Sequence, residues 1–185
     1  LGVEVDLLKQ EFKAVAVGDC CLVLVRGGVI IKSFPIENAD DFSNHPALVG
    51  TKGGFPVEAK KELVELLQGG DIMIFASDAL AAWILAHKDT KPWEFFLEIV
   101  SDELRVKQKD FFAKNVEEIN KQYEKVFPIN QNYFSRLVFG EHKATNQMSR
   151  WGIHNLIFRS FIAKERASGR LKNDDVTLFV IEFEN

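Results

Sequence analysis

The sequence predicts an α+β fold, and three observations carry this prediction. Residues 14–36 hold two β-rich runs joined by Gly27 and Gly28, a pair that can take the positive φ of a tight hairpin turn. Residues 72–86 read as a buried strand followed at once by a helix. Apolar residues at helical spacing then dominate residues 93–127, so both helices and strands are expected to contribute to the core.

Composition favours a single domain over residues 1–185. Of the 185 residues, 46% are hydrophobic, which is enough for one sizeable core. A formal net charge of -4, with Lys and Arg scattered along the chain, argues against nucleic-acid binding through a broad basic face. Apolar runs fall short of the roughly 20 residues of a membrane helix, and the N-terminus lacks the form of a signal peptide. We therefore expect a cytoplasmic protein without a membrane partner.

The segments before the central strand are predicted as a strand, a loop and a helix. Apolar and acidic side chains alternate in residues 1–12, as in a strand that covers one face. Residues 37–54 are expected to form an irregular loop. A helix is expected to begin at Pro56 and to end at Gly69 and Gly70. Its apolar stripe would consist of Leu63, Leu66 and Leu67.

Two neighbouring positions interrupt the first β-rich run. Gly18 and Asp19 are poor strand formers, so they mark either a bulge or a carboxylate turned out of the ladder. Cys20 and Cys21 follow directly, and a disulfide between neighbours would be strained. Reduced, packed thiols are the expectation for both cysteines.

Asp78 stands where the central strand, residues 72–76, gives way to the helix of residues 79–86. An aspartate at such a junction can cap the helix by accepting hydrogen bonds from its first amide groups. It can equally be held rigidly enough by the strand to be a metal ligand. The junction alone leaves both alternatives open.

The last third of the chain is predicted to end on a central strand. A loop with a helical turn is expected over residues 128–152, and a helix over residues 154–167. The strand of residues 176–183 is apolar on both faces, which is typical of a strand buried inside a sheet. Asp174 and Asp175 precede it and would sit at the rim of a sandwich.

Three carboxylates therefore share one setting: each lies at an interruption or an end of a buried strand. They are Asp19, Asp78 and Asp174, with Asp175 as the alternative to the last. Hard cations such as Mg²⁺ and Mn²⁺ take oxygen ligands of this kind. Motifs of zinc hydrolases, P-loop proteins and serine hydrolases are absent, and the four histidines lack a mutual ligand spacing.

Three runs, AVAVGDCCLVLVR, IFASDALAAWIL and NDDVTLFVIEF, occur in an order that resembles the second half of the PPM-type (type 2C) metal-dependent serine/threonine protein phosphatases. That family shows Gly-Asp-Ser in a hairpin strand, Ser-Asp-Gly between a strand and a helix, and Asp-Asn before a last central strand. The resemblance implies a layered β-sandwich flanked by helices, of which only the C-terminal portion is present. Residues 93–168 would then be a helical insertion.

The resemblance also implies an activity and its ligands. Asp78 and Asp174 would bind a binuclear Mn²⁺ or Mg²⁺ centre, and Asp19 an outer, third ion. Such a centre hydrolyses phosphoserine and phosphothreonine in a protein substrate. The chain departs from the family pattern where it has Cys20 for Ser, Ala79 for Gly and Asp175 for Asn, and where Ala82 replaces an acidic residue often found there.

The family's N-terminal metal and phosphate ligands have no counterpart before Asp19, which leaves three hypotheses. The chain is a fragment of a phosphatase completed by its missing half, and then inactive alone. Alternatively, it is a PPM-like interaction module without catalysis, for which Ala79, Ala82 and Asp175 are the motivating residues. In the third, it is a plain α+β domain whose aspartates are caps and turn residues. Uncovered strand edges would favour association with the missing half or with a second copy.

Overall fold

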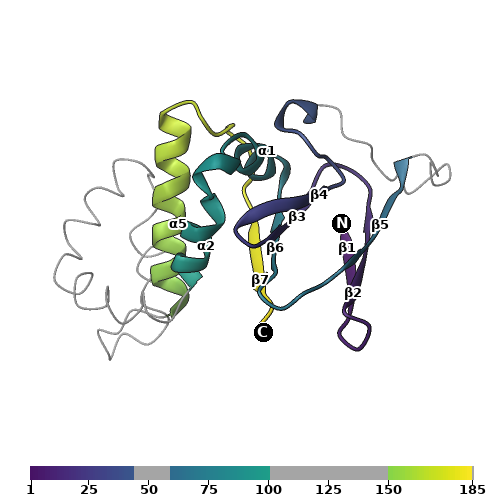
Figure 1. The fold of residues 1–185 in the computed structure, drawn as a ribbon. Coiled ribbons are helices and arrows are strands. Elements are labelled where there is room, and N and C mark those ends of the chain that lie inside the picture. The colour runs from purple at the N-terminus through teal and green to yellow at the C-terminus, as the bar shows by residue number, and fades with distance from the viewer. Residues whose placement is uncertain (44–58, 101–149, 185) are drawn as a thin grey trace. The chain divides into compact units, whose positions relative to one another are not determined.

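The computed structural model describes residues 1–43, 59–100 and 150–184 (Figure 1). The chain divides into two compact units. The β unit comprises residues 1–93 and 171–185, and the helical unit comprises residues 94–170. Each unit is described by itself below.

Two antiparallel sheets make up the β unit. Sheet A has the order β1-β2-β5, with β1 at Gly2–Asp6, β2 at Glu11–Ala16 and β5 at Lys61–Leu66. Sheet B has the order β4-β3-β6-β7, with β3 at Cys21–Arg26, β4 at Val29–Phe34, β6 at Ile72–Ala76 and β7 at Leu178–Glu182. Antiparallel sheets together with helices confirm the predicted α+β class.

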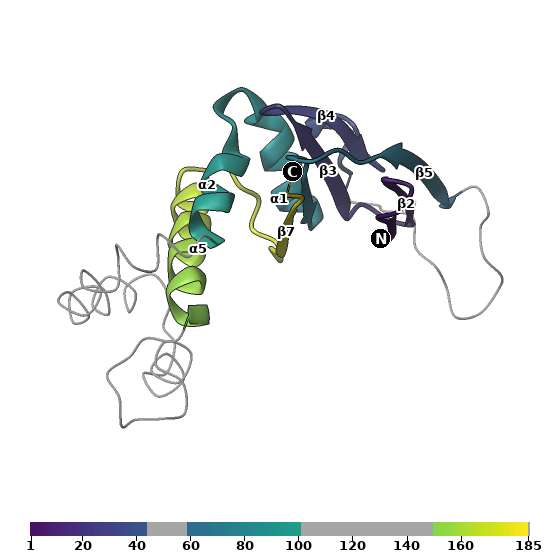
Figure 2. The same ribbon diagram turned by 60° about the horizontal axis from the view of Figure 1, so that its bottom comes forward.

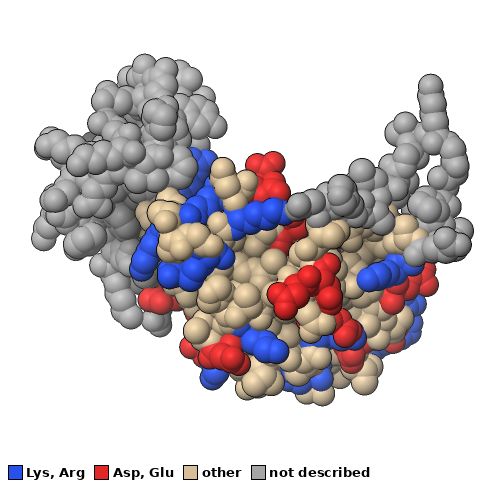
Figure 3. Space-filling model, turned by 90° about the horizontal axis from the view of Figure 1, so that it is seen from above, with Lys and Arg blue, Asp and Glu red and all other residues tan. Residues whose placement is uncertain are grey.

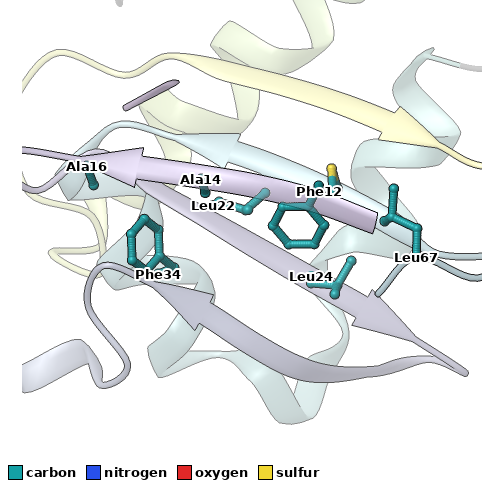
Figure 4. Packing of buried hydrophobic residues seen from close by; sticks show 8 residues of the cluster. Phe12, Ala14, Ala16, Leu22, Leu24, Phe34 and Leu67 are labelled. Carbon is teal, nitrogen blue, oxygen red and sulfur yellow. The ribbon is translucent and has the colours of Figure 1, made fainter. Parts of the chain in front are cut away.

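The core of the β unit lies between the two sheets. Phe12 on β2 is fully buried and belongs to one cluster with Leu22 and Leu24 on β3 (Figure 4). Met73 on β6 joins the same cluster, so both sheets contribute. Because alternate residues of a strand point to opposite faces, one side chain in two enters this layer. The layered sandwich that the sequence predicts is therefore confirmed.

Sheet B carries a second buried face on its other side. Val23 and Val25 on β3, like Ile74 on β6, are buried although they alternate with the residues of the sandwich core. The helix α1, Asp78–Ala86, packs against β3 and β6 and covers this face. The two central strands of sheet B are thus dry on both sides, which explains their uninterrupted apolar sequence.

The interruption at Gly18 and Asp19 is a crossing between the sheets. β2 ends at Ala16 in sheet A, and β3 begins at Cys21 in sheet B. Gly18 takes a φ of 91°, which a residue with a side chain rarely adopts. The predicted hairpin between β3 and β4 is confirmed, with positive φ at both glycines of its turn.

The helix expected before Gly69 is wrong where the structure describes it, because residues 61–66 form the strand β5. Leu63 and Leu67 lie at helical spacing. In the strand, however, Leu63 faces the sandwich core and its neighbour Val64 points to the opposite face. Pairing with β2 along six positions satisfies the backbone and outweighs local helix preference. Pro56, the expected start of this helix, lies outside the described residues.

The closing strand is shorter than expected and is not central in the described part of the chain. β7 spans Leu178–Glu182 and ends the strand order of sheet B, next to β6. Phe179 is 59% exposed, so one side of this strand is not dry. The prediction of a central strand was wrong because an apolar sequence on both faces of β7 does not determine which strands lie beside it.

The helical unit contains most of α2, Pro92–Val100, together with α5, Arg150–Ala167. The two helices run side by side (Figure 1, Figure 2), and the Phe95 and Phe161 rings lie 5.1 Å apart. Helix α5 confirms the prediction for residues 154–167, and α2 confirms the start of the helical stretch. The expectations for residues 101–149 lie outside the described residues.

Short 3-10 helices, η1 at Ala39–Asp41 and η3 at Lys88–Thr90, complete the elements that we describe. Of the helices in the described ranges, none is both long and apolar enough to cross a membrane.

Candidate functional site

Strand register aligns three strand ends at one end of sheet B. Cys21, the first residue of β3, pairs with Ala76, the last residue of β6. Ala76 also pairs with Leu178, the first residue of β7. The polypeptide therefore enters β3, leaves β6 and enters β7 in one row. We call this row the open end of sheet B.

All three predicted ligands flank the open end. Asp19 precedes β3 by two residues, Asp78 follows β6 by two, and Asp174 precedes β7 by four. Asp19 and Asp78 are half-buried, and Asp174 is exposed. Within the described residues, no side-chain hydrogen bond or ion pair joins the carboxylate of Asp19 or Asp78 to another group. Strand order and register thus place the three positions at the same end of sheet B.

Figure 3 views the molecule from above, on the side where α1 lies in Figure 1. Acidic side chains stand there in separate groups among uncharged residues, and basic side chains stand among them as well. The described part of this face carries neither a continuous acidic field nor a continuous basic one.

Ser77, rather than Asp78, occupies the N-cap position of α1. Its φ of -65° and ψ of 162° are extended, and Asp78 is the first helical residue. Of the two alternatives for Asp78, the one that makes it the N-cap residue of the helix is therefore wrong. A negative charge in the first helical turn is still favourable, because the helix N-terminus carries partial positive charge.

Ser77 ties the segment before β7 to the start of α1, a role that sequence reasoning missed. Its Oγ donates to the carbonyl of Asp175 at 3.0 Å and accepts the amide of Thr177 at 3.1 Å. The amide of Ser77 donates to the carbonyl of Thr177 at 3.2 Å. The backbone next to Asp174 is therefore held close to the backbone next to Asp78. Only the sequence position of Ser77, directly after a strand, hinted at this role.

The donor chemistry of the open end suits a hard cation, but the described residues do not complete a site. Carboxylate oxygens are the ligands that Mg²⁺ and Mn²⁺ prefer. Among the side chains of the described ranges, no group of three or more His, Cys, Asp and Glu could hold a metal ion. Asp19, Asp78 and Asp174 lie at the open end of sheet B, but they do not form a complete metal site.

The two cysteines beside Asp19 have different environments. Both are free thiols; Cys21 is buried and Cys20 is exposed. Burial raises the pKa of the Cys21 thiol to about 12, so this side chain stays neutral and acts as a core residue. The expectation of two packed thiols is therefore right for Cys21 and wrong for Cys20.

A buried ion pair occupies the opposite end of sheet B, which we call the closed end. Arg26, the last residue of β3, donates from Nε to Asp71 Oδ1 at 2.8 Å and from Nη2 to Asp71 Oδ2 at 2.7 Å. The amide of Gln68 also donates to Asp71 Oδ2, at 2.8 Å. Arg26 Nη2 reaches the carbonyl of Leu66, at 2.8 Å. Asp71 is completely buried, and this network compensates its charge.

The pKa of Asp71 reflects this compensation. Burial alone would raise the pKa of its carboxyl, but the hydrogen bonds from Arg26 and Gln68 together with the Arg26 charge hold it below its ordinary value of 3.8. Asp71 therefore stays ionised at neutral pH and serves the fold. Sequence reasoning missed this pair, because its two members are 45 positions apart.

Comparison with known proteins gives matches only among solved structures. No protein-family model matches the chain, and no curated protein matches it. The photosystem II phosphatase PBCP is similar at 20% identity over 42% of this chain and 30% of that chain, with a TM-score of 0.34. The phosphatase domain of the cell fate determinant SpoIIE from Bacillus subtilis is similar at 16% identity over 99% of this chain and 57% of that chain, with a TM-score of 0.38.

A second SpoIIE structure holds the PP2C phosphatase domain and a fragment of the regulatory domain. It is similar at 18% identity over 98% of this chain and 36% of that chain, with a TM-score of 0.39. The chain thus spans between 30% and 57% of the length of these three solved chains. The function proposed below rests on the open end and on the sequence motifs around it.

Proposed function

We propose that the chain is the C-terminal portion of a metal-dependent protein phosphatase that hydrolyses phosphoserine and phosphothreonine with Mn²⁺ or Mg²⁺. One observation carries the proposal: strand register gathers Asp19, Asp78 and Asp174 at one end of one sheet. These are the three positions that the motif resemblance assigns to metal binding. Carboxylates at opposite ends of the sheet would have contradicted the proposal.

The environment of these carboxylates supports a role outside folding. The carboxylates of Asp19 and Asp78 have no protein partner within the described residues, and both keep part of their surface in solvent. Carboxylates without a cationic partner at the open end of sheet B raise the local affinity for cations. Bound there, Mn²⁺ or Mg²⁺ would supply an activated water and would stabilise charge on phosphoryl oxygens.

Completion of the site requires ligands from beyond the described residues, since these form no cluster of three. In our proposal, the missing N-terminal half of the domain supplies them. A phosphorylated protein is then the substrate, and the residues of the open end contribute one side of its binding site. The isolated chain is expected to be inactive.

A phosphatase assay on the protein that contains this chain together with its N-terminal half tests the proposal. Hydrolysis of a phosphothreonine peptide should require Mn²⁺ or Mg²⁺ and should fall at least about a hundredfold in Asp78→Asn and Asp174→Asn, because each removes a metal ligand. Asp89→Asn, an exposed aspartate in η3, is the matched control and should keep full activity. Unchanged hydrolysis in Asp78→Asn would refute the metal mechanism.

A second candidate function, binding without catalysis, is favoured by two positions on α1. Ala82 stands where the phosphatases often have an acidic residue, so it offers no carboxylate to an outer metal site. Ala79, which stands in place of Gly, is buried. An interaction module should bind the phosphothreonine peptide equally well with and without Mn²⁺ and should release no phosphate. Calorimetric titration of the peptide against the same protein separates the two functions.

A further inference from the structure

Among the described residues, the backbone groups on the outer edge of β7 have no hydrogen-bond partner. Phe183 donates its amide to the carbonyl of Asp71 at 2.9 Å, and Thr177 accepts the amide of Ser77 at 3.2 Å. In an antiparallel ladder, hydrogen-bonded and non-hydrogen-bonded pairs alternate. Odd-numbered residues of β7 therefore bond to β6, and the even-numbered ones turn their N–H and C=O groups outward. These outward residues are Leu178, Val180 and Glu182.

No other strand in the described ranges pairs with this edge, because β7 ends the strand order of sheet B. An edge strand with free backbone groups is a template for one more strand. Extended polypeptide is the ligand whose backbone can satisfy such a row of donors and acceptors.

An aromatic pair stands beside the edge and offers apolar contact. The Phe179 ring lies 5.7 Å from the Phe75 ring on β6. Phe179 is 59% exposed, and Phe75 is half-buried. Both point to the sandwich side of sheet B, where Ile181 and Phe183 belong to the core and Phe179 remains outside it. An added strand with an apolar side chain on this side would cover Phe179.

Charge argues against a second copy of the chain as the added strand. Residues 173–185 contain four acidic residues and no basic one. Antiparallel pairing of two β7 strands would bring Asp175 of one copy next to the Glu182 and Glu184 end of the other. Parallel pairing in register would place each glutamate of one chain beside the same glutamate of the other chain. Both arrangements place like charges side by side, which is unfavourable.

We propose that the outer edge of β7 binds an extended segment of a partner protein, one that alternates apolar and polar residues and carries Lys or Arg at both ends. The apolar residues cover Phe179, the backbone pairs with Leu178, Val180 and Glu182, and the basic ends meet Asp175 and Glu184. This inference stands on the sheet edge alone. The N-terminal half of the proposed phosphatase is the competing occupant of this edge, and loss of peptide binding when that half is present would assign the edge to it and contradict the inference.

A fluorescent nine-residue peptide, with valine and threonine alternating between terminal lysine pairs, tests the inference by anisotropy. The peptide should bind the chain, and a version with glutamate in place of lysine should bind about fivefold or more weakly, because attraction at its two ends becomes repulsion. A lysine version with alternate amides N-methylated should not bind, because it cannot complete the ladder. No binding of the lysine peptide, or equal binding of all three peptides, would overturn the proposal.

Variants of the chain locate the peptide. Val180→Pro removes an outward N–H and leaves the bonds to β6, so it should abolish peptide binding. Phe179→Ser should weaken binding about tenfold through lost apolar contact, and it tests the same edge without a backbone change. Thermal unfolding of both variants verifies the fold. Sedimentation of the unliganded chain completes the test, since a dimer that Val180→Pro dissociates would show a second copy on this edge and contradict the proposal.

Discussion

One aspartate lies directly before the strand β6 and another lies just after it, and the environments of their carboxylates are opposite. Asp71 is completely buried and accepts three hydrogen bonds from Arg26 and Gln68. Asp78 is half-buried, and its carboxylate has no partner among the described residues. The same residue type thus closes one end of sheet B and leaves the other end open.

This difference separates a carboxylate that serves the fold from one that is available for binding. A buried charge is tolerable only when it is paired, so Asp71 and Arg26 are committed to each other. An unpaired, partly solvated carboxylate costs the fold little and keeps its oxygens for a ligand. The closed end should therefore govern stability, and the open end should govern metal binding.

Removing the closed-end carboxylate should have the largest effect on stability. Asp71→Ala leaves the Arg26 charge without its partner and should lower the free energy of unfolding by about 3 kcal/mol, the low end for a buried pair because Arg26 is 27% exposed. Urea denaturation measures the change. The double variant Arg26→Met, Asp71→Leu should recover part of the loss. A loss below about 1 kcal/mol in Asp71→Ala would contradict the role of the closed end.

Acid should act on the folded chain through the same carboxyl. Because the pKa of folded Asp71 lies below its ordinary value of 3.8, its contribution to stability is complete above that value. The contribution is lost as pH falls through the folded pKa, since the unfolded chain binds the proton first. Asp71→Asn should therefore lose less stability than the native chain over this acidic range. Parallel curves for the two proteins, measured by urea denaturation against pH, would disprove this assignment.

Loosening the open end should have a smaller effect on stability. Ser77→Ala removes the hydroxyl that bridges Asp175 and Thr177, and the free energy of unfolding should fall by about 1 kcal/mol. Amide exchange of Thr177 should accelerate, while exchange in β2 should follow the global change only. Equal acceleration in both regions would show that Ser77 acts on the whole fold.

The sequence was most informative where local pattern and tertiary packing agree. The strand of residues 72–76 and the helix after it are confirmed, because a buried apolar run and a run of strong helix formers leave little choice. β5 was missed because its leucines fit two periods, and only pairing with β2 decides between them. The edge position of β7 was missed for a similar reason, since strand order depends on neighbours distant in sequence.

For the site, sequence reasoning selected the carboxylates of the open end but not the network around them. Asp19, Asp78 and Asp174 were recognisable because strand interruptions and ends are visible in the pattern. Ser77 and the pair of Arg26 with Asp71 were not, because their roles depend on contacts across the sheet. Whether the three carboxylates bind metal stays a prediction.

Titration of the chain with Mn²⁺ by calorimetry tests the central claim most directly. Because the carboxylates of Asp19 and Asp78 have no protein partner among the described residues, the chain should take up Mn²⁺ weakly, and Asp78→Asn and Asp174→Asn should each weaken binding at least about tenfold. The exposed control Asp89→Asn should bind like the native chain. No uptake of Mn²⁺, or equal uptake by the native chain and Asp78→Asn, would contradict the assignment of the open end to metal binding.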